Sequence, residues 1–455
     1  MKKGNSSLDI INGPLYKNIM IFSIPLMFSQ MLQILFNSAD TIIVGKFAGD
    51  SALAAVGATS SIVFLLTSLF SGLATGSNVL IARFVGLGNK QKISDAVHTS
   101  ILIALLSGFF LTFAGFFSAR FLLGLMDTPA DILDQSTLYM RIYFAGVLFL
   151  LLFDFGSAIL RSKGDTKRPL YFLIISGIIN VILNLFTVII LRWDVAGVAT
   201  ATVISEAVSA FLVVFILLKE EGEMKLDWKK LHLNKEITKD ILRIGIPAGL
   251  SGVIFSLSNV FIQSAINSFN STSVVAGNSA GANIEGYVYI GYTGIVQATI
   301  TFTSQVMGAG RKDRLFPILK ATVILVTGLT IVASALVCLG GPWILRLYTD
   351  EPSVVDIGMI RTNWVAKYLV LNGLMDAFVN SMRGMGVSTL PTLLMVLGIC
   401  IVRMMWLGFV FPAMKTLDSI YMCYPVSWII TLIIEIVLWV IVYRRVMASW
   451  HFKDR

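Results

Sequence analysis

Charged side chains are scarce in this chain of 455 residues, where Asp, Glu, Lys and Arg together make up only 13%. A soluble globular domain carries about 25%. Hydrophobic residues make up 56% of the chain and the mean hydropathy is +0.82. A soluble core could not bury this much apolar surface, so lipid must cover much of it. The composition excludes an ordinary soluble enzyme and indicates a membrane protein.

Cysteine and histidine are also rare, with three of each in the chain. No two cysteines form a Cys-x-x-Cys pair, which argues against a disulfide framework and against a metal site. The histidines, His98, His232 and His451, lie in or beside polar segments and are expected to be solvated loop residues. We therefore expect no cofactor.

Several motifs are missing. The chain has no G-x-x-x-x-G-K-[ST] sequence, so a nucleotide-driven pump is not indicated. No catalytic groups cluster along the sequence, which argues against a membrane enzyme. There is no RNA-binding motif and no zinc-ligand spacing, so the net charge of +9 does not call for nucleic acid. Residues 1–12 are polar and no small-residue cleavage site follows, so a cleavable signal peptide is not expected.

Long apolar runs dominate what is present. Runs of about 20 residues or more are long enough to cross a bilayer as helices, and they are too long and too apolar to be barrel strands. The predicted fold is therefore all-α, a polytopic membrane protein with twelve transmembrane helices. The predicted spans are 16–44, 52–80, 94–118, 133–160, 169–192, 195–218, 239–267, 274–306, 316–340, 354–382, 390–411 and 419–446.

The basic residues are distributed unevenly between the loops. One set of alternate loops, together with both tails, holds 26 of the 35 Lys and Arg residues, and the opposite loops hold 8. Arg403 lies within a span. Cytoplasmic loops carry the excess of Lys and Arg. The pattern predicts a multi-pass protein of the cytoplasmic (inner) membrane with both termini in the cytoplasm, facing an anionic lipid surface.

The chain repeats itself at an offset of 222 residues. Pro25 corresponds to Pro247, Asp154 to Asp376, and Arg161 to Arg383. Because each half has an even number of spans, both halves keep the same orientation, related by an axis along the membrane normal. The predicted organisation is two homologous six-helix lobes, residues 1–218 and 239–455, joined by a charged cytoplasmic linker at 219–238. Two such lobes suit alternating access about a central site.

Several segments resemble the multidrug and toxic compound extrusion (MATE) family of bacterial exporters. In the first half these are Ser-Ala-Asp-Thr-Ile-Ile-Val-Gly ending at Gly45, Ala-Leu-Ala-Ala-Val-Gly ending at Gly57, and Val-Gly-Leu-Gly-Asn-Lys ending at Lys90. In the second half, Gln-Val-Met-Gly-Ala-Gly ending at Gly310 repeats the last of them. The resemblance covers essentially the whole chain. It implies the twelve-span, two-lobe fold and drug export coupled to H⁺ or Na⁺.

A polar stripe on the first span marks the leading functional candidate. Gln30, Gln33, Asn37 and Asp40 are spaced by three or four residues and so share one helix face. Inserting an aspartate at the centre of a membrane span costs on the order of 2.5 kcal/mol or more in free energy. An acid in such a position therefore indicates a function. Burial disfavours the charged form of a carboxyl group, which suits reversible protonation of Asp40. The resemblance also places the family's essential carboxylate here.

Three further residues are candidates for cation or proton coupling together with Asp40: Asn180 and Asn184 on the fifth span and Thr202 on the sixth. The resemblance implies that these positions complete a first-lobe cation site, usually written Asn-x-x-Leu-Asp. Here the motif ends in Asn184 instead of the second acid. Na⁺ favours several oxygen ligands and neutralising charge. The substitution therefore favours H⁺ over Na⁺ as the coupling ion, while packing between helices remains the alternative role for all three.

The second lobe offers Asn259 and Gln263 on its first span, which join Gln33 and Asn37 as candidates for the substrate pathway. Glu285 could either attract substrate or make a helix contact. The sodium-coupled branch of the family that the chain resembles has an acid on the first span of this lobe. In this chain the polar stripe of that span, which includes Asn259 and Gln263, contains no acid. The sequence leaves undecided the roles of the other charged residues within spans, Asp154, Glu206, Asp376, Arg403 and Glu435.

Methionine and aromatic residues are frequent in the spans, and such side chains suit promiscuous apolar binding, while a carboxylate beside rings suits lipophilic cations. The expected function is a secondary multidrug efflux antiporter, acting as a monomer on small-molecule drugs or metabolites. The alternative is a lipid-linked oligosaccharide flippase of the same superfamily. That function would favour a cleft lined with Arg and Lys.

Overall fold

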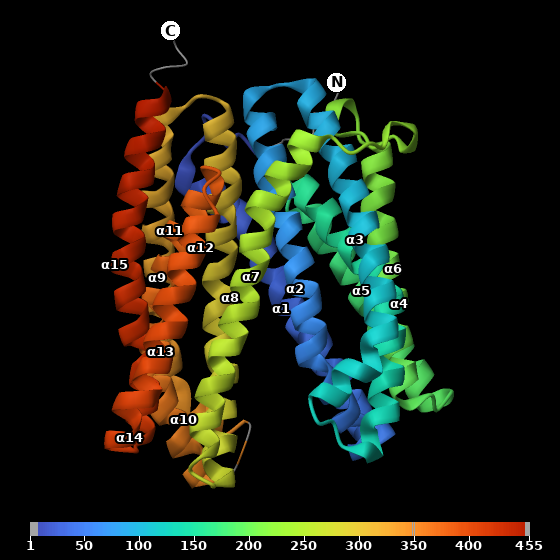
Figure 1. Cartoon of the computed structure of the whole chain (residues 1–455), viewed down its shortest axis with the longest axis vertical. Coiled ribbons are helices and arrows are strands. Elements are labelled where there is room, and N and C mark those ends of the chain that lie inside the picture. The colour runs from blue at the N-terminus through green and yellow to red at the C-terminus, as the bar shows by residue number, and fades with distance from the viewer. Residues whose placement is uncertain (1–7, 348, 350, 451–455) are drawn as a thin grey trace. The chain divides into compact units, whose positions relative to one another are not determined.

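The computed structural model describes residues 8–347, 349 and 351–450. The all-α prediction is confirmed, since every regular element in that part of the chain is a helix (Figure 1). The longer helices are α1 (Leu15–Ile43), α2 (Asp50–Leu87), α3 (Lys90–Leu125), α4 (Ala130–Ser162), α5 (Lys167–Asn184), α6 (Asp194–Lys219), α7 (Lys235–Asn267), α8 (Thr272–Gly308), α9 (Leu315–Leu345), α10 (Pro352–Trp364), α11 (Leu369–Gly384) and α15 (Leu417–Trp450).

One further span is built from short pieces. Two π-helical segments, η7 (Leu397–Ile401) and η8 (Trp406–Val410), separate three α-helical pieces that run on as one helix. The pieces are α12 (Thr389–Val396), α13 (Val402–Met405) and α14 (Phe411–Met414). π-Helical turns widen a helix locally by adding a residue to the turn.

Each of the twelve predicted spans has a helical counterpart. Ten helices in the described chain are long and apolar enough to cross a membrane. The other two predicted spans are special cases. Residues 274–306 form α8, which carries several polar side chains. Residues 354–382 are divided between α10 and α11 by the 3-10 turn η6 (Ala366–Tyr368), a break that hydropathy alone does not reveal.

The helices group into two compact units. The first unit comprises mainly Phe28–Leu250, and the second comprises Asp9–Met27 with the described residues from Ser251 onward. Both boundaries fall inside a helix, so α1 and α7 each contribute to both units. These units are defined by which residues pack together and not by the sequence repeat. The lobe boundaries at 218 and 239 therefore stay a prediction.

Glycine turns repeat at the 222-residue offset. Gly88 and Gly310 follow α2 and α8 with φ of 67° and 71°, and Gly164 and Gly386 follow α4 and α11 with φ of 99° and 89°. Glycine adopts positive φ without the steric cost that a Cβ brings. The same residue type therefore ends the corresponding helix in each half.

Small residues let α2 and α7 approach closely within the first unit. A Cβ on Gly72 would lie 2.3 Å from the backbone N of Gly249, and one on Gly245 would lie 2.6 Å from the Cα of Leu73. A Cβ on Gly76 would likewise lie 2.4 Å from the backbone carbonyl oxygen of Ile241. Gly-x-x-x-Gly spacing on both helices permits such backbone contact in membranes.

The linker is packed against the first unit, and here one prediction is wrong. His98, expected to be a solvated loop residue, is buried in α3. Its Nδ1 lies 2.6 Å from the Ser94 carbonyl oxygen, and its Nε2 lies 3.0 Å from the backbone N of Asp227 in the linker. His232 is half exposed, and His451 lies outside the described residues. A hydrogen-bonded buried histidine looks the same in sequence as a loop histidine.

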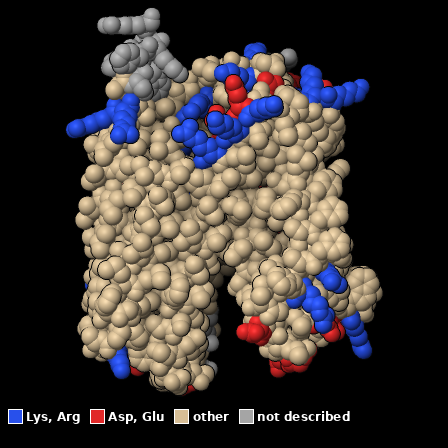
Figure 2. Space-filling model, in the orientation of Figure 1, with Lys and Arg blue, Asp and Glu red and all other residues tan. Residues whose placement is uncertain are grey.

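Charge is confined to the ends of the helices on the face that Figure 2 shows. Lys, Arg, Asp and Glu cluster there beside the turns, and the long stretch between them is almost free of charge. This is the distribution expected of helices whose middle portions face lipid.

Candidate coupling and binding sites

The first unit brings together Asp40 and the two asparagines of α5. The Asn184 side-chain amide donates to Asp40 Oδ1 at 2.5 Å and to Asn180 Oδ1 at 3.2 Å. Both asparagines are buried. They lie one turn apart because α5 is helical to its last residue, which is Asn184. Predicted neighbours from two distant segments, 144 residues apart, are thus in direct contact.

Thr202 on α6 also lies close enough to interact with the Asp40 carboxylate. Two oxygens at this site remain open. The Asn184 Oδ1 and Thr202 Oγ1 atoms are buried and have no hydrogen-bond partner of good geometry among the described residues. Buried polar atoms are normally paired, so unpaired oxygens beside a carboxylate indicate room for a proton or cation.

Two π-helical segments flank this site, a feature the sequence did not reveal. The segment η1 (Val44–Ala48) begins four residues after Asp40, and η2 (Leu185–Ile190) begins directly after Asn184. The two segments pack against each other. π-Helical turns are rare in proteins as a whole, and many of those that occur lie at functional sites.

One more acid of the first unit, Glu206, lies within electrostatic range of Asp40. Glu206 on α6 interacts with both Asp40 and Asp154. Asp154 on α4 accepts a hydrogen bond from the Ser71 hydroxyl at 2.5 Å, whereas Glu206 Oε2 is buried without a partner among the described residues. Like charges at short range disfavour simultaneous ionisation. Glu206 is therefore the acid that interacts with both of the others.

The predicted pathway residues of α1 stay candidates. Gln33 and Asn37 are both exposed, although they lie within a span. The backbone carbonyl oxygen of Asn37 accepts a hydrogen bond from the Thr41 hydroxyl, and this bond does not involve the Asn37 side-chain amide. Lipid would leave such amides unpaired, so this stretch of α1 favours a polar environment.

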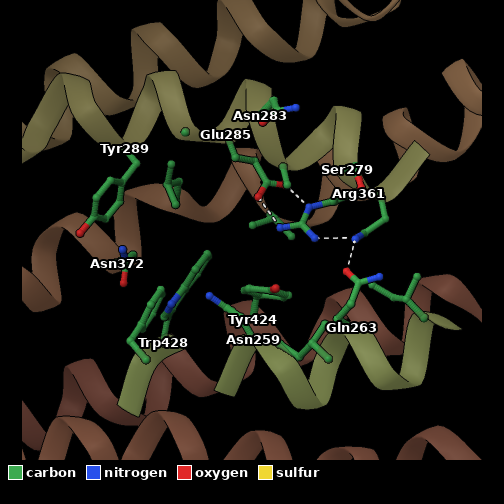
Figure 3. Close-up of a pocket in the computed structure, with 18 residues that line it drawn as sticks. Asn259, Gln263, Ser279, Asn283, Glu285, Tyr289, Arg361, Asn372, Tyr424 and Trp428 are labelled. Carbon is green, nitrogen blue, oxygen red and sulfur yellow. Dashed lines mark hydrogen bonds and ion pairs between the residues drawn. The ribbon is translucent and has the colours of Figure 1, made fainter. Parts of the chain in front are cut away.

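The second unit contains a cavity of about 540 Å³, lined by the predicted candidates Asn259, Gln263 and Glu285 (Figure 3). Glu285 on α8 is bound by Arg361 on α10 through two hydrogen bonds, of 2.9 and 2.8 Å. Arg361 also donates to Asn278 Oδ1 at 2.6 Å. Of the two roles left open for Glu285, the structure therefore provides a helix contact.

Arg361 is a residue that the sequence reasoning missed. It lies within the predicted span 354–382 but was not among the candidates, and it is buried in an ion pair. That an arginine on α10 faces an acid on α8 is visible only once the helices are packed. The Asn278 amide extends the network by donating to Gln263 Oε1 at 3.0 Å.

Arg403 on α13 has polar and aromatic neighbours instead of an acid. Its guanidinium donates to Ser427 and Ser258, and it lies 4.3 Å from the centre of the Tyr424 ring. Aromatic faces attract cations, more strongly where water is excluded. One of its nitrogens, Nη2, has no partner among the described residues.

Arg383, the repeat counterpart of Arg161, is buried within the second unit. It donates to Asn380, Ser251 and Thr392, and so joins α11 to α7 and α12. It also interacts electrostatically with Asp376 and Glu435. These contacts give both acids a positive neighbour inside the bundle.

No metal site emerges from the part of the chain that is described, where no three His, Cys, Asp or Glu side chains lie close enough to hold an ion. The Asp40 site is built from one carboxylate, two amides and a hydroxyl. Such a set offers oxygen atoms and one negative charge, which matches a proton or a monovalent cation better than a structural metal.

Comparisons with known proteins agree on one family. The MatE family matches residues 25–186 and again 247–407, so the family's unit occurs twice in the chain. The probable multidrug resistance protein YoeA of Bacillus subtilis is 28% identical over 434 residues, 92% of each chain. The probable multidrug resistance protein YpnP of the same organism is 27% identical over 379 residues, 81% of this chain and 84% of that one.

Solved structures share the fold. A multidrug resistance MATE family transporter of the MOP superfamily, solved in an outward-facing conformation, superposes with a TM-score of 0.91. The match covers 98% of this chain and all of that one at 21% identity. The two matched regions correspond to the two halves of the sequence repeat, which confirms the two-lobe, multi-helix architecture.

Proposed function

We propose that this chain, which belongs to the MatE family of multidrug efflux transporters, exports lipophilic and often cationic small molecules in exchange for H⁺. Membership of the family makes it a multi-pass membrane transporter and not an enzyme. The antiport mode, the coupling ion and the class of substrate are our proposals. The repeated architecture supports alternating access, in which two repeats move about a site.

The observation that carries the proposal is the arrangement of Asn184 around Asp40. An amide has two N–H donors and one carbonyl acceptor. Asn184 directs its donors at Asp40 and Asn180, and its carbonyl oxygen is left open. An ionised Asp40 can only accept hydrogen bonds, and here it receives one from an N–H group. The arrangement therefore fits the ionised form of Asp40.

A protonated Asp40 would need an acceptor for its own O–H, and the site provides one. The Asn184 Oδ1 has no partner among the described residues and can accept a hydrogen bond, and the Thr202 hydroxyl, which lies close to Asp40, can accept as well as donate. The same side chains thus serve both charge states of one carboxyl group. A change in the hydrogen bonds of α1, α5 and α6 on protonation would link the coupling ion to helix movement.

The same geometry favours H⁺ over Na⁺. Sodium would need several oxygens and negative charge, and the site holds one carboxylate among neutral groups. A proton needs only Asp40. Glu206 is near enough to interact electrostatically and offers a second protonatable group.

We further propose the cytoplasmic (inner) membrane as the location, with both termini in the cytoplasm and the monomer as the working unit. The terminal Lys and Arg residues, at positions 2, 3, 453 and 455, lie outside the described residues. The flippase alternative is not favoured. Arg361 is paired with Glu285, and Arg403 is buried against rings and hydroxyls, so neither guanidinium is exposed to a pyrophosphate.

Dye efflux tests the proposal. Everted vesicles containing the wild type should move a fluorescent lipophilic dye when a gradient is imposed, and vesicles with Asp40→Asn should not. The variant should express and fold normally, because Asn can accept the Asn184 hydrogen bond through its own carbonyl. Unimpaired efflux by a well-expressed Asp40→Asn protein would refute the proposal.

A further inference from the structure

The cavity of the second unit is charge-balanced at its lining. Among the described residues that line it, only Glu285 and Arg361 are charged, and they bind each other through two hydrogen bonds. The remaining polar lining consists of amides and hydroxyls, with Asn259 and Asn283 among them. The one carboxylate of the described lining is thus already bound to a guanidinium, which disfavours a cation here.

A positive charge also lies against the wall of the cavity. Arg403 lies directly behind Tyr424, a lining residue, with 4.3 Å between the guanidinium carbon and the ring centre. Its hydrogen bonds go to serine hydroxyls, which carry no compensating charge. In a medium of low dielectric constant, this charge disfavours a cationic guest.

Two buried polar atoms on the cavity wall lack partners. Trp428 Nε1 is a donor and Asn372 Oδ1 is an acceptor, and neither has a hydrogen bond to any residue described. Trp428 and Asn372 are 2% and 3% exposed. Figure 3 shows both at the same end of the cavity, away from Arg361. Since unpaired buried polar atoms are costly, the pair favours a guest with an acceptor and a donor near each other.

Aromatic side chains form much of the remaining wall. Phe255, Tyr289, Tyr424 and Trp428 all line the cavity. Tyr424 and Trp428 are arranged edge to face, with their ring centres 5.6 Å apart. Flat apolar walls with few polar groups are typical of ligand pockets, and aromatic walls suit flat rings.

We infer that this cavity is a binding site for uncharged, planar heteroaromatic molecules whose edge carries a hydrogen-bond donor beside an acceptor. The Trp428 indole N–H and the Asn372 side-chain oxygen would form hydrogen bonds with that edge of the guest, and the aromatic side chains of the wall would stack on the guest's flat faces. The inference rests on the proposed export function, since it defines a second substrate class. This substrate class differs from the lipophilic cations that we expect to bind near the acids of the first unit.

Equilibrium binding tests this without any gradient. The probes are lumichrome, a neutral tricyclic dione with adjacent N–H and C=O groups, and proflavine, a tricyclic cation of similar size. Fluorescence polarisation with purified protein should show tighter binding of lumichrome. Because the site is separate from Asp40, Asp40→Asn should lose efflux and keep lumichrome binding, so a failure here and a failure of the proposed function give different results.

Two variants locate the binding. Trp428→Phe keeps a ring and removes the donor, and it should raise the lumichrome Kd about 3- to 10-fold, the effect of one hydrogen bond. Trp343→Phe, at an exposed tryptophan outside the cavity, is the matched control and should change nothing. Asn283→Asp adds a carboxylate at an exposed lining position and should improve proflavine binding roughly 10-fold.

Equal or tighter binding of proflavine by the wild type would overturn the inference, as would no measurable binding of lumichrome. Lumichrome affinity that ignores Trp428→Phe, or proflavine affinity that ignores Asn283→Asp, would place the probe elsewhere and would also overturn it. If Trp428→Phe does not fold, the proflavine response to Asn283→Asp decides alone, because Asn283 is exposed.

Discussion

Arg361 on α10 and Glu285 on α8 bind each other through two hydrogen bonds, with both side chains 9% exposed. This geometry is the strong, directional form of the ion pair. Burial of the two charges is costly, so the pair contributes little net stability, but removal of one partner leaves the other charge buried alone. The pair also connects to Asn278 and through it to Gln263.

Glu285→Gln should therefore destabilise the protein by about 3–5 kcal/mol, since Arg361 loses its counter-charge. The double variant Glu285→Met with Arg361→Met should recover most of that loss. Unfolding of the purified protein by heat in detergent provides the measurement. The control is Asp356→Asn, which changes an exposed acid on α10 itself. A single variant as stable as the wild type would show that Arg361 has another counter-charge.

The Glu285–Arg361 pair also shows what sequence reasoning can and cannot find. The spans, the repeat and the polar faces of single helices follow from periodicity, because residues on one helix face are fixed by spacing along one chain segment. The grouping of Asp40 with Asn180 and Asn184 is what the resemblance to the MATE family implies. Arg361 and Glu285 lie 76 residues apart on different helices. Their meeting depends on helix packing, which spacing within one helix does not determine.

The break after α10 and the π-helical turns beside Asp40 were missed for a related reason. Such irregularities arise from a single extra or missing residue per turn, and hydropathy averages over them. One missed feature did have a signal in the sequence. Gly72 and Gly76, with Gly245 and Gly249, form two Gly-x-x-x-Gly pairs, a spacing associated with close helix contact.

Gly72→Ala should impair folding, because the new Cβ would lie 2.3 Å from the backbone of Gly249 and backbone cannot move aside as a flexible side chain can. We expect a loss of about 1–3 kcal/mol, as for overpacked cores. Gly57→Ala in the same helix is the matched control, since nothing lies within 4 Å of its Cβ position. Expression yield and melting temperature in detergent report the effect. Similar behaviour of the two variants would mean that α2 and α7 are not in this contact.

Glu220, just after α6, should make stability depend on pH. Partial burial alone would raise the pKa of its carboxyl group, but Arg168, at 2.7 Å, and Lys163, at 3.2 Å, outweigh this and hold the pKa below its usual value. A group with a depressed folded-state pKa stabilises the protein above its unfolded pKa of about 4.3. That stability is lost as the pH falls through the folded-state pKa.

Glu220→Gln should therefore lower the melting temperature at pH 7, and the difference from the wild type should shrink as the pH falls below about 4. Glu221→Gln, at the exposed neighbouring residue, is the control and should have little effect at either pH. A Glu220→Gln deficit that stays constant from pH 7 to pH 3 would show that packing, and not charge, is what the substitution removes.

The identity of the coupling ion is the central claim and rests on Asn184 standing beside Asp40. Replacing Asn184 with Asp puts a second carboxylate in place of the amide that now donates a hydrogen bond to Asp40. Two carboxylates with Asn180 and Thr202 would offer the charge and oxygens that favour Na⁺. Asn184→Asp should therefore make efflux depend more strongly on Na⁺ than it does in the wild type.

The decisive measurement is dye efflux from everted vesicles in which a pH gradient or a Na⁺ gradient is imposed separately. We predict that the pH gradient alone drives efflux by the wild type and that Asn184→Asp gains a response to the Na⁺ gradient. Wild-type efflux that follows the Na⁺ gradient and ignores the pH gradient would contradict the assignment of Asp40 as a proton site.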